Sequence, residues 1–158
     1  MKKISAFKLK NFVSYLSCVE EFENPNVKLE QYMTPPDITA NMFSIFHFEE
    51  DAIESKTIAD FCCGTGMYSI ASTYFKPDKV FGFDIDTEAL QTCTENIENA
   101  ELVDQIELVQ CNICEIQDNP RFKDYFDTVI MNPPFGTKNN EGIDMKLLST
   151  AIYVRIFS

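Results

Sequence analysis

The turn Asn132-Pro-Pro-Phe135 carries the side chains best suited to chemistry in this chain. It follows the apolar run 129–131, which is typical of a parallel strand covered by helices on both faces. The prolines supply no backbone N–H, so the strand must end there. The turn offers an amide oxygen, backbone carbonyls and an aromatic face, which together can hold a flat ring with an exocyclic amine. A proline-rich turn with a buried Phe is the alternative, and the tetrapeptide alone leaves both open.

A glycine-containing loop, Cys62–Gly66, is the second candidate site, because it lies between a predicted strand and a predicted helix. With Asp60 it forms the pattern Asp-x-x-x-Gly-x-Gly, whose glycines let the backbone approach a ligand closely. Asp84 ends the next predicted strand, where a carboxylate can accept both hydroxyls of a ribose. The loop alone is weak evidence, since any tight strand–helix turn can use two glycines, but loop and acid together indicate an adenosine-containing cofactor.

The details of this loop favour S-adenosylmethionine as that cofactor. A hydride carrier would normally show G-x-G-x-x-G, but position 69 is Ser, and the chain has no Gly-Lys-Ser/Thr phosphate loop. S-adenosylmethionine has no pyrophosphate and needs no phosphate cradle. Asn112, just after the third predicted strand, can bond the cofactor's adenine amine or be a simple turn residue.

Neither the cysteines nor the histidine predict a metal site. Cys111-x-x-Cys114 has no second Cys pair at ligand spacing, and the only histidine, His47, has no suitable partner nearby in the sequence. We therefore expect no metal. The six cysteines show no disulfide-scaffold spacing, which fits an intracellular protein.

The charge and hydropathy of the chain limit its partners. A net charge of −12 counts against an extended nucleic-acid surface, although it leaves room for a small catalytic pocket that takes one nucleotide. The basic residues near the N-terminus can form a solvated helix face or an RNA-binding arm; they are Lys2, Lys3, Lys8 and Lys10. No segment approaches the roughly 20 apolar residues of a membrane span, and a signal-peptide core is missing, so we expect an intracellular protein that does not contact membranes.

Alternating strands and helices position these candidate residues. Strands are predicted at residues 57–61, 80–83, 106–109 and 126–131. Helices are predicted at 67–75, from Asp86 or Thr87 to about Ala100, and from Asp144 to about Val154. This alternation predicts βαβ units with right-handed crossovers and a parallel sheet, in an α/β fold.

The length of 158 residues predicts one domain. Residues 1–48 form its helical extension and cofactor loop, and 57–158 form the βαβ core. Within the extension, apolar spacing predicts an amphipathic helix over 4–22, and a second helix follows the loop Glu30–Asp37 and ends before 49–51. The fourth strand has no partner on its outer side, so the sheet is expected to be incomplete at the C-terminus.

Several of these motifs resemble the class I methyltransferases that modify adenine N6. The motifs are Asp60–Gly66, Gly82–Asp86 and Asn132–Asn140, together with the loop Glu30–Pro36. From about residue 28 to about residue 152 the chain resembles the methyltransferase-like protein five family of ribosomal RNA adenine-N6 methyltransferases. The resemblance implies a Rossmann-like class I fold, a small-subunit ribosomal RNA substrate and a location in nucleus and cytoplasm. It also implies a small zinc-ribbon activator subunit that adds a strand to the sheet, with the strand at 106–109 as the receiving edge.

The resemblance also implies roles for individual residues. Asn132 would bind the target amine, within the catalytic turn of Asn132, Pro133, Pro134 and Phe135. The implied cofactor-binding residues are Gln31, Thr34, Asp60, Cys62, Gly64, Thr65, Gly66, Met67, Asp84, Asn112 and Ile113. The chain departs from the family at Cys62, where a glycine is usual, and at Asn112, where an aspartate is usual. It also ends before the C-terminal strands of the family.

These residues suggest how methyl transfer to an aryl amine would proceed. The amine is a poor nucleophile, but the Asn132 amide oxygen and the Pro133 carbonyl can accept both N6 hydrogens, and Phe135 can stack on the adenine. Transfer in line would then require an unstacked or flipped nucleotide. Two alternatives stay open: a methyltransferase for glutamine or another amide nitrogen in protein, which the acidic charge favours, and a catalytically silent shortened form that binds a partner.

Overall fold

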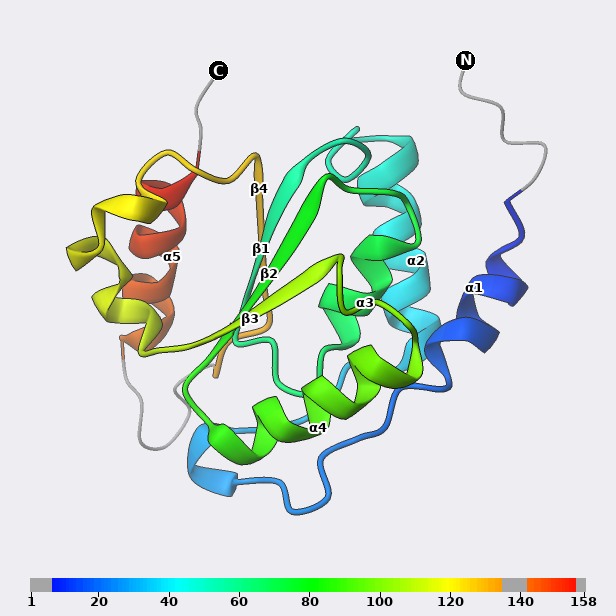
Figure 1. Cartoon of the computed structure of the whole chain (residues 1–158), viewed down its shortest axis with the longest axis horizontal. Coiled ribbons are helices and arrows are strands. Elements are labelled where there is room, and N and C mark those ends of the chain that lie inside the picture. The colour runs from blue at the N-terminus through cyan, green and yellow to red at the C-terminus, as the bar shows by residue number, and fades with distance from the viewer. Residues whose placement is uncertain (1–6, 135–141, 156–158) are drawn as a thin grey trace.

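A four-stranded parallel sheet with the order β3-β2-β1-β4 forms the centre of the computed structural model, which describes residues 7–134 and 142–155 (Figure 1). The strands are β1 (Thr57–Phe61), β2 (Lys79–Asp84), β3 (Ile106–Gln110) and β4 (Thr128–Met131). The predicted parallel sheet is therefore confirmed. The register places Ala59 beside Phe81 of β2 and Val129 of β4, so the carboxyl ends of all four strands meet at one edge.

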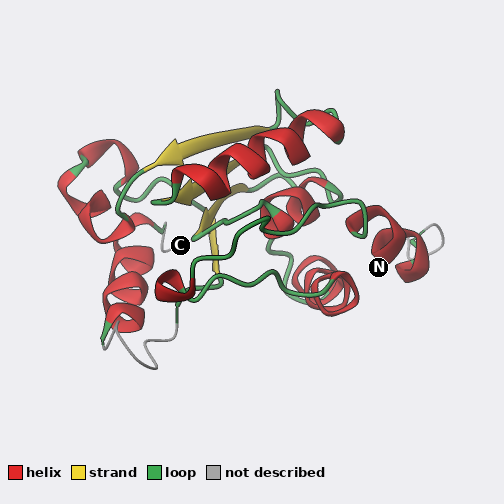
Figure 2. Cartoon of the chain, turned by 90° about the horizontal axis from the view of Figure 1, so that it is seen from below, coloured by secondary structure: helices red, strands yellow, loops and turns green. Residues whose placement is uncertain are grey.

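Helices cover both faces of this sheet (Figures 1 and 2). The α-helices are α1 (Leu9–Leu16), α2 (Pro36–Phe48), α3 (Met67–Thr73), α4 (Thr87–Asn99) and α5 (Ile143–Val154). The 3-10 helices are η2 (Val27–Leu29), η3 (Ile113–Asp118) and η4 (Pro120–Phe122). Helices α1 to α4 pack on one face, whereas α5, η3 and η4 pack on the other. The chain is thus a three-layer α/β structure.

Residues from the strands contribute side chains to two hydrophobic cores, one on each face of the sheet. Ile58, Val80 and Ile130 belong to the core under α1 to α4. Phe61, Phe83 and their neighbours belong to the other core, where the two rings meet edge to face at 5.5 Å between centroids. Because each strand buries side chains on both faces, it reads in sequence as a nearly continuous apolar run.

Of the helix predicted over 4–22, only Leu9–Leu16 is helical, as α1; residues 4–6 lie outside the described residues, and the prediction is wrong for 7–8 and beyond Leu16. The chain turns after Ser17, and the backbone N–H of Glu20 donates to Asn96 Oδ1 of α4 at 3.0 Å. The amide nitrogen of Asn96 donates back to the Glu20 carbonyl at 3.1 Å. This side chain replaces the helical bonds that the periodicity predicted, since buried backbone groups need a partner but not a helical one.

The fourth strand begins later than predicted, at Thr128. Phe126, two residues earlier, forms an isolated bridge with Arg155 and donates its N–H to the Val154 carbonyl at 3.0 Å. Asp127 pairs with Thr57 of β1 twice: its N–H donates to the Thr57 carbonyl at 2.9 Å, and its carboxylate accepts the Thr57 N–H at 2.8 Å. Among the described residues, β3 and β4 are the two edges of the sheet. The prediction that the third strand is an edge is therefore confirmed.

Candidate functional site

A cavity of about 240 Å³ opens at the carboxyl edge of the sheet. Every strand contributes to its wall: Asp60 and Cys62 at the end of β1, Asp84 at the end of β2, Cys111 after β3 and Asn132 after β4. The loop from Leu29 to Thr34 closes the opposite side. Open parallel sheets bind their ligands in this position, outside the carboxyl ends of the strands.

The loop Cys62–Gly66 bends sharply between β1 and α3. Gly64 and Gly66 have φ values of +54° and +95°, in the left-handed region that glycine enters without a steric penalty. A Cβ on Gly64 would stand 2.7 Å from Cζ of Phe22, so the backbone here also passes too close to an aromatic ring for any side chain. The loop is tied to β2 because the Cys63 N–H donates to the Phe83 carbonyl at 3.0 Å.

Cys62 adopts the same left-handed conformation, with φ of +59°. A side chain in that region costs about 1–2 kcal/mol, which explains why a glycine would suit the position better. The loop nevertheless keeps its turn, so the departure from the family pattern is accommodated as local strain. Burial raises the pKa of the Cys62 thiol to about 12, with Asp84 and Asp60 adding to the shift, so the thiol stays neutral.

Asp84 links this loop to the end of β2. One carboxylate oxygen accepts the Gly64 N–H at 2.8 Å and the other accepts the Asp86 N–H at 3.0 Å. Burial raises the pKa of the Asp84 carboxyl, and the hydrogen bonds from these backbone groups oppose the shift. Each carboxylate oxygen can accept a second hydrogen bond, so the side chain still has capacity for two ligand hydroxyls.

Asp60 lies behind the loop, with 1% of its surface exposed. Its carboxylate accepts a hydrogen bond from Ser69 Oγ at 2.7 Å. Burial raises the pKa of Asp60 to about 7, the Ser69 hydrogen bond opposes this, and the negative charge of Asp84 adds to it. Ser69 occupies the position of the last glycine in the G-x-G-x-x-G pattern of hydride carriers. Its hydroxyl holds the Asp60 carboxylate in place.

The opposite end of the cavity is formed by Asn132, Thr34 and Tyr68. The Asn132 amide nitrogen donates to Thr34 Oγ1 at 3.5 Å, and Thr34 Oγ1 lies 2.9 Å from the Tyr68 hydroxyl. Since the amide nitrogen is turned to Thr34, the amide oxygen is turned away from it. Pro134 lines the cavity, whereas Phe135 lies outside the described residues.

The side-chain amides of two predicted cofactor-contact residues form intramolecular hydrogen bonds. Gln31 donates to Asp86 Oδ2 at 2.6 Å and accepts the Asn26 N–H at 2.8 Å, which holds the loop before α2 against the start of α4. Asn112 is exposed and caps η3, where it accepts the Cys114 N–H at 3.2 Å and donates to Glu115 at 3.0 Å. Either amide oxygen has one further lone pair for a ligand.

The cavity brings most of the predicted residues together. Its wall includes Gln31, Thr34, Asp60, Cys62, Gly64, Thr65, Met67, Asp84, Asn112, Ile113, Asn132 and Pro134. Gly66 and Pro133 are not in the wall; Gly66 instead caps α3. Sequence reasoning missed Phe22, Tyr32 and Tyr68, which also line it. Tyr68 carried a signal, as a polar aromatic residue directly after the glycine loop, whereas Phe22 reaches the cavity only because the chain turns after α1.

The structure also describes residues that could have formed a metal site or a basic surface. Within residues 7–134 and 142–155, no group of three His, Cys, Asp or Glu side chains is arranged to hold a metal. The His47 ring stacks on Phe75 with centroids 4.4 Å apart, inside an aromatic cluster. Lys8 and Lys10 are exposed, and Lys2 and Lys3 lie outside the described residues. None of the described helices is long and apolar enough to cross a membrane.

The wall of the cavity fits S-adenosylmethionine chemically. This wall holds a carboxylate that could accept ribose hydroxyls (Asp84), the apolar side chains of Ile85 and Ile113, and Asp60, which carries a negative charge for a sulfonium when it is ionised.

Comparison with known proteins agrees with this arrangement. Residues 36–153 match the Methyltransferase small domain family. The chain is 47% identical over 145 residues to the rRNA N(6)-adenosine-methyltransferase METTL5 of Danio rerio, covering 92% of this chain and 69% of that protein. It is 39% identical over 149 residues to the corresponding Mettl5 enzyme of Drosophila melanogaster, covering 94% and 69%.

A solved structure shares the fold. The crystal structure of a protein from Pyrococcus horikoshii, assigned as an RNA methyltransferase, superposes with a TM-score of 0.82 at 30% sequence identity. The match covers 94% of this chain and 69% of that one. The Rossmann-like methyltransferase fold that the sequence predicted is thus confirmed. This chain belongs to the Methyltransferase small domain family and, within it, to the METTL5 family of rRNA N(6)-adenosine methyltransferases.

Proposed function

We propose that this chain transfers the methyl group of S-adenosylmethionine to the exocyclic N6 amine of an adenosine in ribosomal RNA. The observation that carries the proposal is the position of Asn132. Its amide oxygen is turned away from Thr34 at one end of a cavity whose other end is built from the glycine loop and Asp84. An acceptor for an amine and a site for an adenosine-containing cofactor therefore share one enclosure.

The cofactor end would be held by the residues that the family motif identifies. Asp84 would accept the ribose hydroxyls, the backbone of Cys62 to Thr65 would follow the cofactor closely, and Ile113 would pack on its adenine. Asn112 would offer its remaining lone pair to the adenine amine. When bound, S-adenosylmethionine supplies an electrophilic methyl group on a sulfonium. The negative charge of Asp60 would favour that cation once the carboxyl is ionised.

Asn132 and Pro133 would prepare the amine for attack. The Asn132 oxygen would accept one N6 hydrogen, and the Pro133 carbonyl would accept the other from outside the cavity wall, which Pro133 does not line. Together they would direct the nitrogen lone pair out of the ring plane. Positioning and electrostatics supply the main catalytic contributions, so no strong base is needed. The proton leaves to water after transfer, because a methylated aryl ammonium is acidic. Phe135 would stack on the adenine, which must be unstacked to enter.

The experiment is methyl transfer from labelled S-adenosylmethionine to ribosomal RNA and, in parallel, to ribosomal proteins. We expect the label in RNA, recovered as N6-methyladenosine after digestion to nucleosides. Label in glutamine or another amide side chain would instead support the protein methyltransferase that the net charge of −12 favours. Cofactor binding without transfer to either substrate would support a catalytically silent binding module.

We also propose a zinc-ribbon activator subunit as a partner, docked on β3. This strand is one edge of the sheet, and an edge strand presents N–H and C=O groups that can template an added strand. The test compares the chain purified alone and with the activator. We expect a higher melting temperature and faster methyl transfer in the complex, whereas equal values would contradict the partner. A ribosomal RNA substrate would place this single-domain enzyme inside the cell, in nucleus and cytoplasm.

A further inference from the structure

We infer that Tyr68 is a positioning residue that acts through Thr34 to orient the amide of Asn132. The inference rests on the proposed function, because it assigns a role within the same site. Tyr68 lies in the first turn of α3, Thr34 lies in the loop before α2, and Asn132 follows β4. Three elements distant in sequence thus meet in one chain of hydrogen bonds.

Tyr68 is held firmly on its apolar side. Its ring packs against Phe43 of α2 with centroids 5.5 Å apart, and 8% of the residue is exposed. Its hydroxyl reaches Thr34 Oγ1 at 2.9 Å, and Thr34 is equally buried, with 7% exposed. Buried hydroxyl groups need partners, so each of these two fixes the other. Burial raises the pKa of Tyr68, which keeps the phenol neutral.

The hydroxyl of Thr34 selects one of the two orientations of the Asn132 amide. The amide nitrogen can only donate, and Thr34 Oγ1 accepts from it at 3.5 Å. A flipped amide would turn its oxygen to Thr34 and would need the single Thr34 hydrogen as donor. Either hydroxyl of the Thr34–Tyr68 pair can be the donor. When Thr34 gives its hydrogen to the Tyr68 hydroxyl, the flipped orientation has no donor, and in that arrangement Tyr68 favours the orientation in which the Asn132 oxygen is available to an incoming amine.

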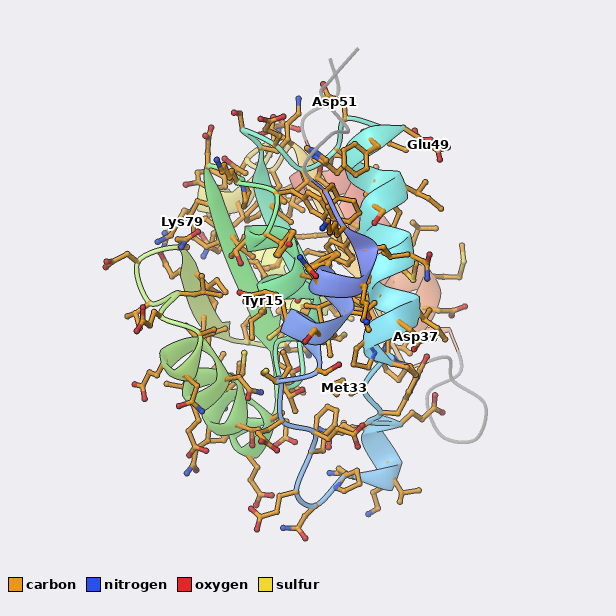
Figure 3. All side chains as sticks on the ribbon, turned by 90° about the vertical axis from the view of Figure 1, so that its right-hand side faces the viewer. Tyr15, Met33, Asp37, Glu49, Asp51 and Lys79 are labelled. Carbon is orange, nitrogen blue, oxygen red and sulfur yellow. The ribbon has the colours of Figure 1, made fainter. Side chains whose placement is uncertain are left out.

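This role differs from the one expected of Thr34. The family pattern implies a cofactor contact at Thr34, but its hydroxyl bonds with Tyr68 and Asn132, at the acceptor end of the cavity. The start of α2 also fixes Thr34, since Thr39 Oγ1 donates to the Thr34 carbonyl at 3.4 Å. Figure 3 shows Met33, the residue before Thr34, in the chain just ahead of α2, with Asp37 at the beginning of that helix. The start of α2 thus fixes the loop that carries Thr34.

The first measurement is kinetic, on Tyr68→Phe in the full chain. This variant keeps the ring and removes only the hydroxyl. We expect kcat to fall by about 3- to 10-fold, the range for one neutral hydrogen bond, with cofactor affinity unchanged. Tyr15→Phe is the matched control, because Tyr15 lies on α1 (Figure 3), its ring packs against Tyr74 with centroids 5.5 Å apart, and its side chain does not line the cavity. Its kcat should equal that of the parent.

A double-mutant cycle tests whether the effect passes through Thr34. Thr34→Val removes the acceptor, and adding Tyr68→Phe to it should cause no further loss of kcat. Thr34→Ser, which keeps the hydroxyl, should restore most of the activity. Additive losses would overturn the inference, as would a Tyr68→Phe variant that melts earlier but turns over as fast as the parent.

The second measurement does not require activity. In a chain labelled with nitrogen-15, the Asn132 side-chain amide signal is identified by its loss in Asn132→Asp. We expect Tyr68→Phe to shift or broaden this signal and Tyr15→Phe to leave it unchanged. An unchanged signal in Tyr68→Phe would overturn the inference whatever the enzyme does. A parent chain that methylates no adenosine would instead overturn the proposed function, while the amide signal still decides the role of Tyr68.

Discussion

The two ends of the cavity are held together in different ways. At the cofactor end, Asp84 receives two backbone N–H bonds of 2.8 and 3.0 Å, and Gln31 bonds Asp86 at 2.6 Å. At the acceptor end, the Asn132 side chain donates a single bond of 3.5 Å to Thr34. The cofactor end is therefore preorganised by two short bonds from the backbone and one between side chains, whereas the acceptor end depends on bonds between side chains alone. We expect changes at the first to alter affinity and changes at the second to alter turnover.

The largest expected effect is at the acceptor end. Asn132→Ala should reduce kcat by about 100-fold or more, because it removes the acceptor that polarises the amine, while cofactor affinity stays the same. The measurement combines steady-state transfer to ribosomal RNA with calorimetric cofactor titration. Asn41→Ala is the control, since that exposed amide donates only to the Asp37 carbonyl within α2. Equal turnover of parent and Asn132→Ala would mean that the proline turn is only structural.

Asp84→Ala should affect the cofactor end of the cavity and leave the acceptor end unchanged. It removes an acceptor proposed for two ribose hydroxyls, and charge-assisted bonds of this type contribute about 1.5–3 kcal/mol, which corresponds to about 10- to 150-fold in Kd. Calorimetry should show the weaker cofactor binding, and saturating cofactor should recover much of the turnover. An unchanged Kd would remove Asp84 from the cofactor site.

Glycine substitutions test the tightness of the loop. Gly64→Ala places a Cβ at 2.7 Å from Phe22 at a φ of +54°, so we expect about 1–2 kcal/mol from the backbone and a further cost from the contact. Gly142→Ala is a matched control, because its φ of +80° is also left-handed but nothing lies within 4 Å of the added Cβ. Thermal unfolding should show the larger loss for Gly64→Ala. Equal losses would mean that Phe22 moves aside freely.

The smallest expected effect is the pH dependence of cofactor binding. With the pKa of Asp60 raised to about 7, its ionised fraction increases about threefold between pH 6.5 and 7.5. Since the ionised carboxylate favours a sulfonium, cofactor affinity should increase with pH over this interval by up to that factor. Asp60→Asn keeps an acceptor for Ser69 and should abolish this dependence. A parent and variant with the same pH profile would contradict the assignment.

The raised pKa of Asp60 also predicts how stability depends on pH, and here the change has the opposite sign. Between about pH 4 and pH 7 the folded protein keeps a proton on Asp60 that the unfolded chain has lost. The free energy of unfolding without cofactor should therefore decrease as the pH rises through this window and level off above it. Asp60→Asn should flatten the profile. Melting temperatures of both proteins across the window provide the measurement.

Local signals in the sequence determined the fold and most of the cavity wall. The first strand was predicted at the residues where β1 lies, and Asp86 caps α4 as one of the two predicted alternatives. These features depend on neighbouring residues, through apolar runs, glycines and a capping side chain. The carboxyl ends of parallel strands must meet at one edge, so Asp60, Asp84 and Asn132 could be placed in one site before their distances were known.

Only the tertiary structure decided which side chains touch across the cavity. The bond between Thr34 and Asn132 joins residues 98 positions apart, and the bonds between Glu20 and Asn96 join residues 76 apart. No periodicity carries such pairings, because they depend on how α1, α2 and α4 pack on the sheet. The left-handed backbone of Cys62 is a further case, since a local preference for other conformations is overridden there by the turn that β1 and α3 require.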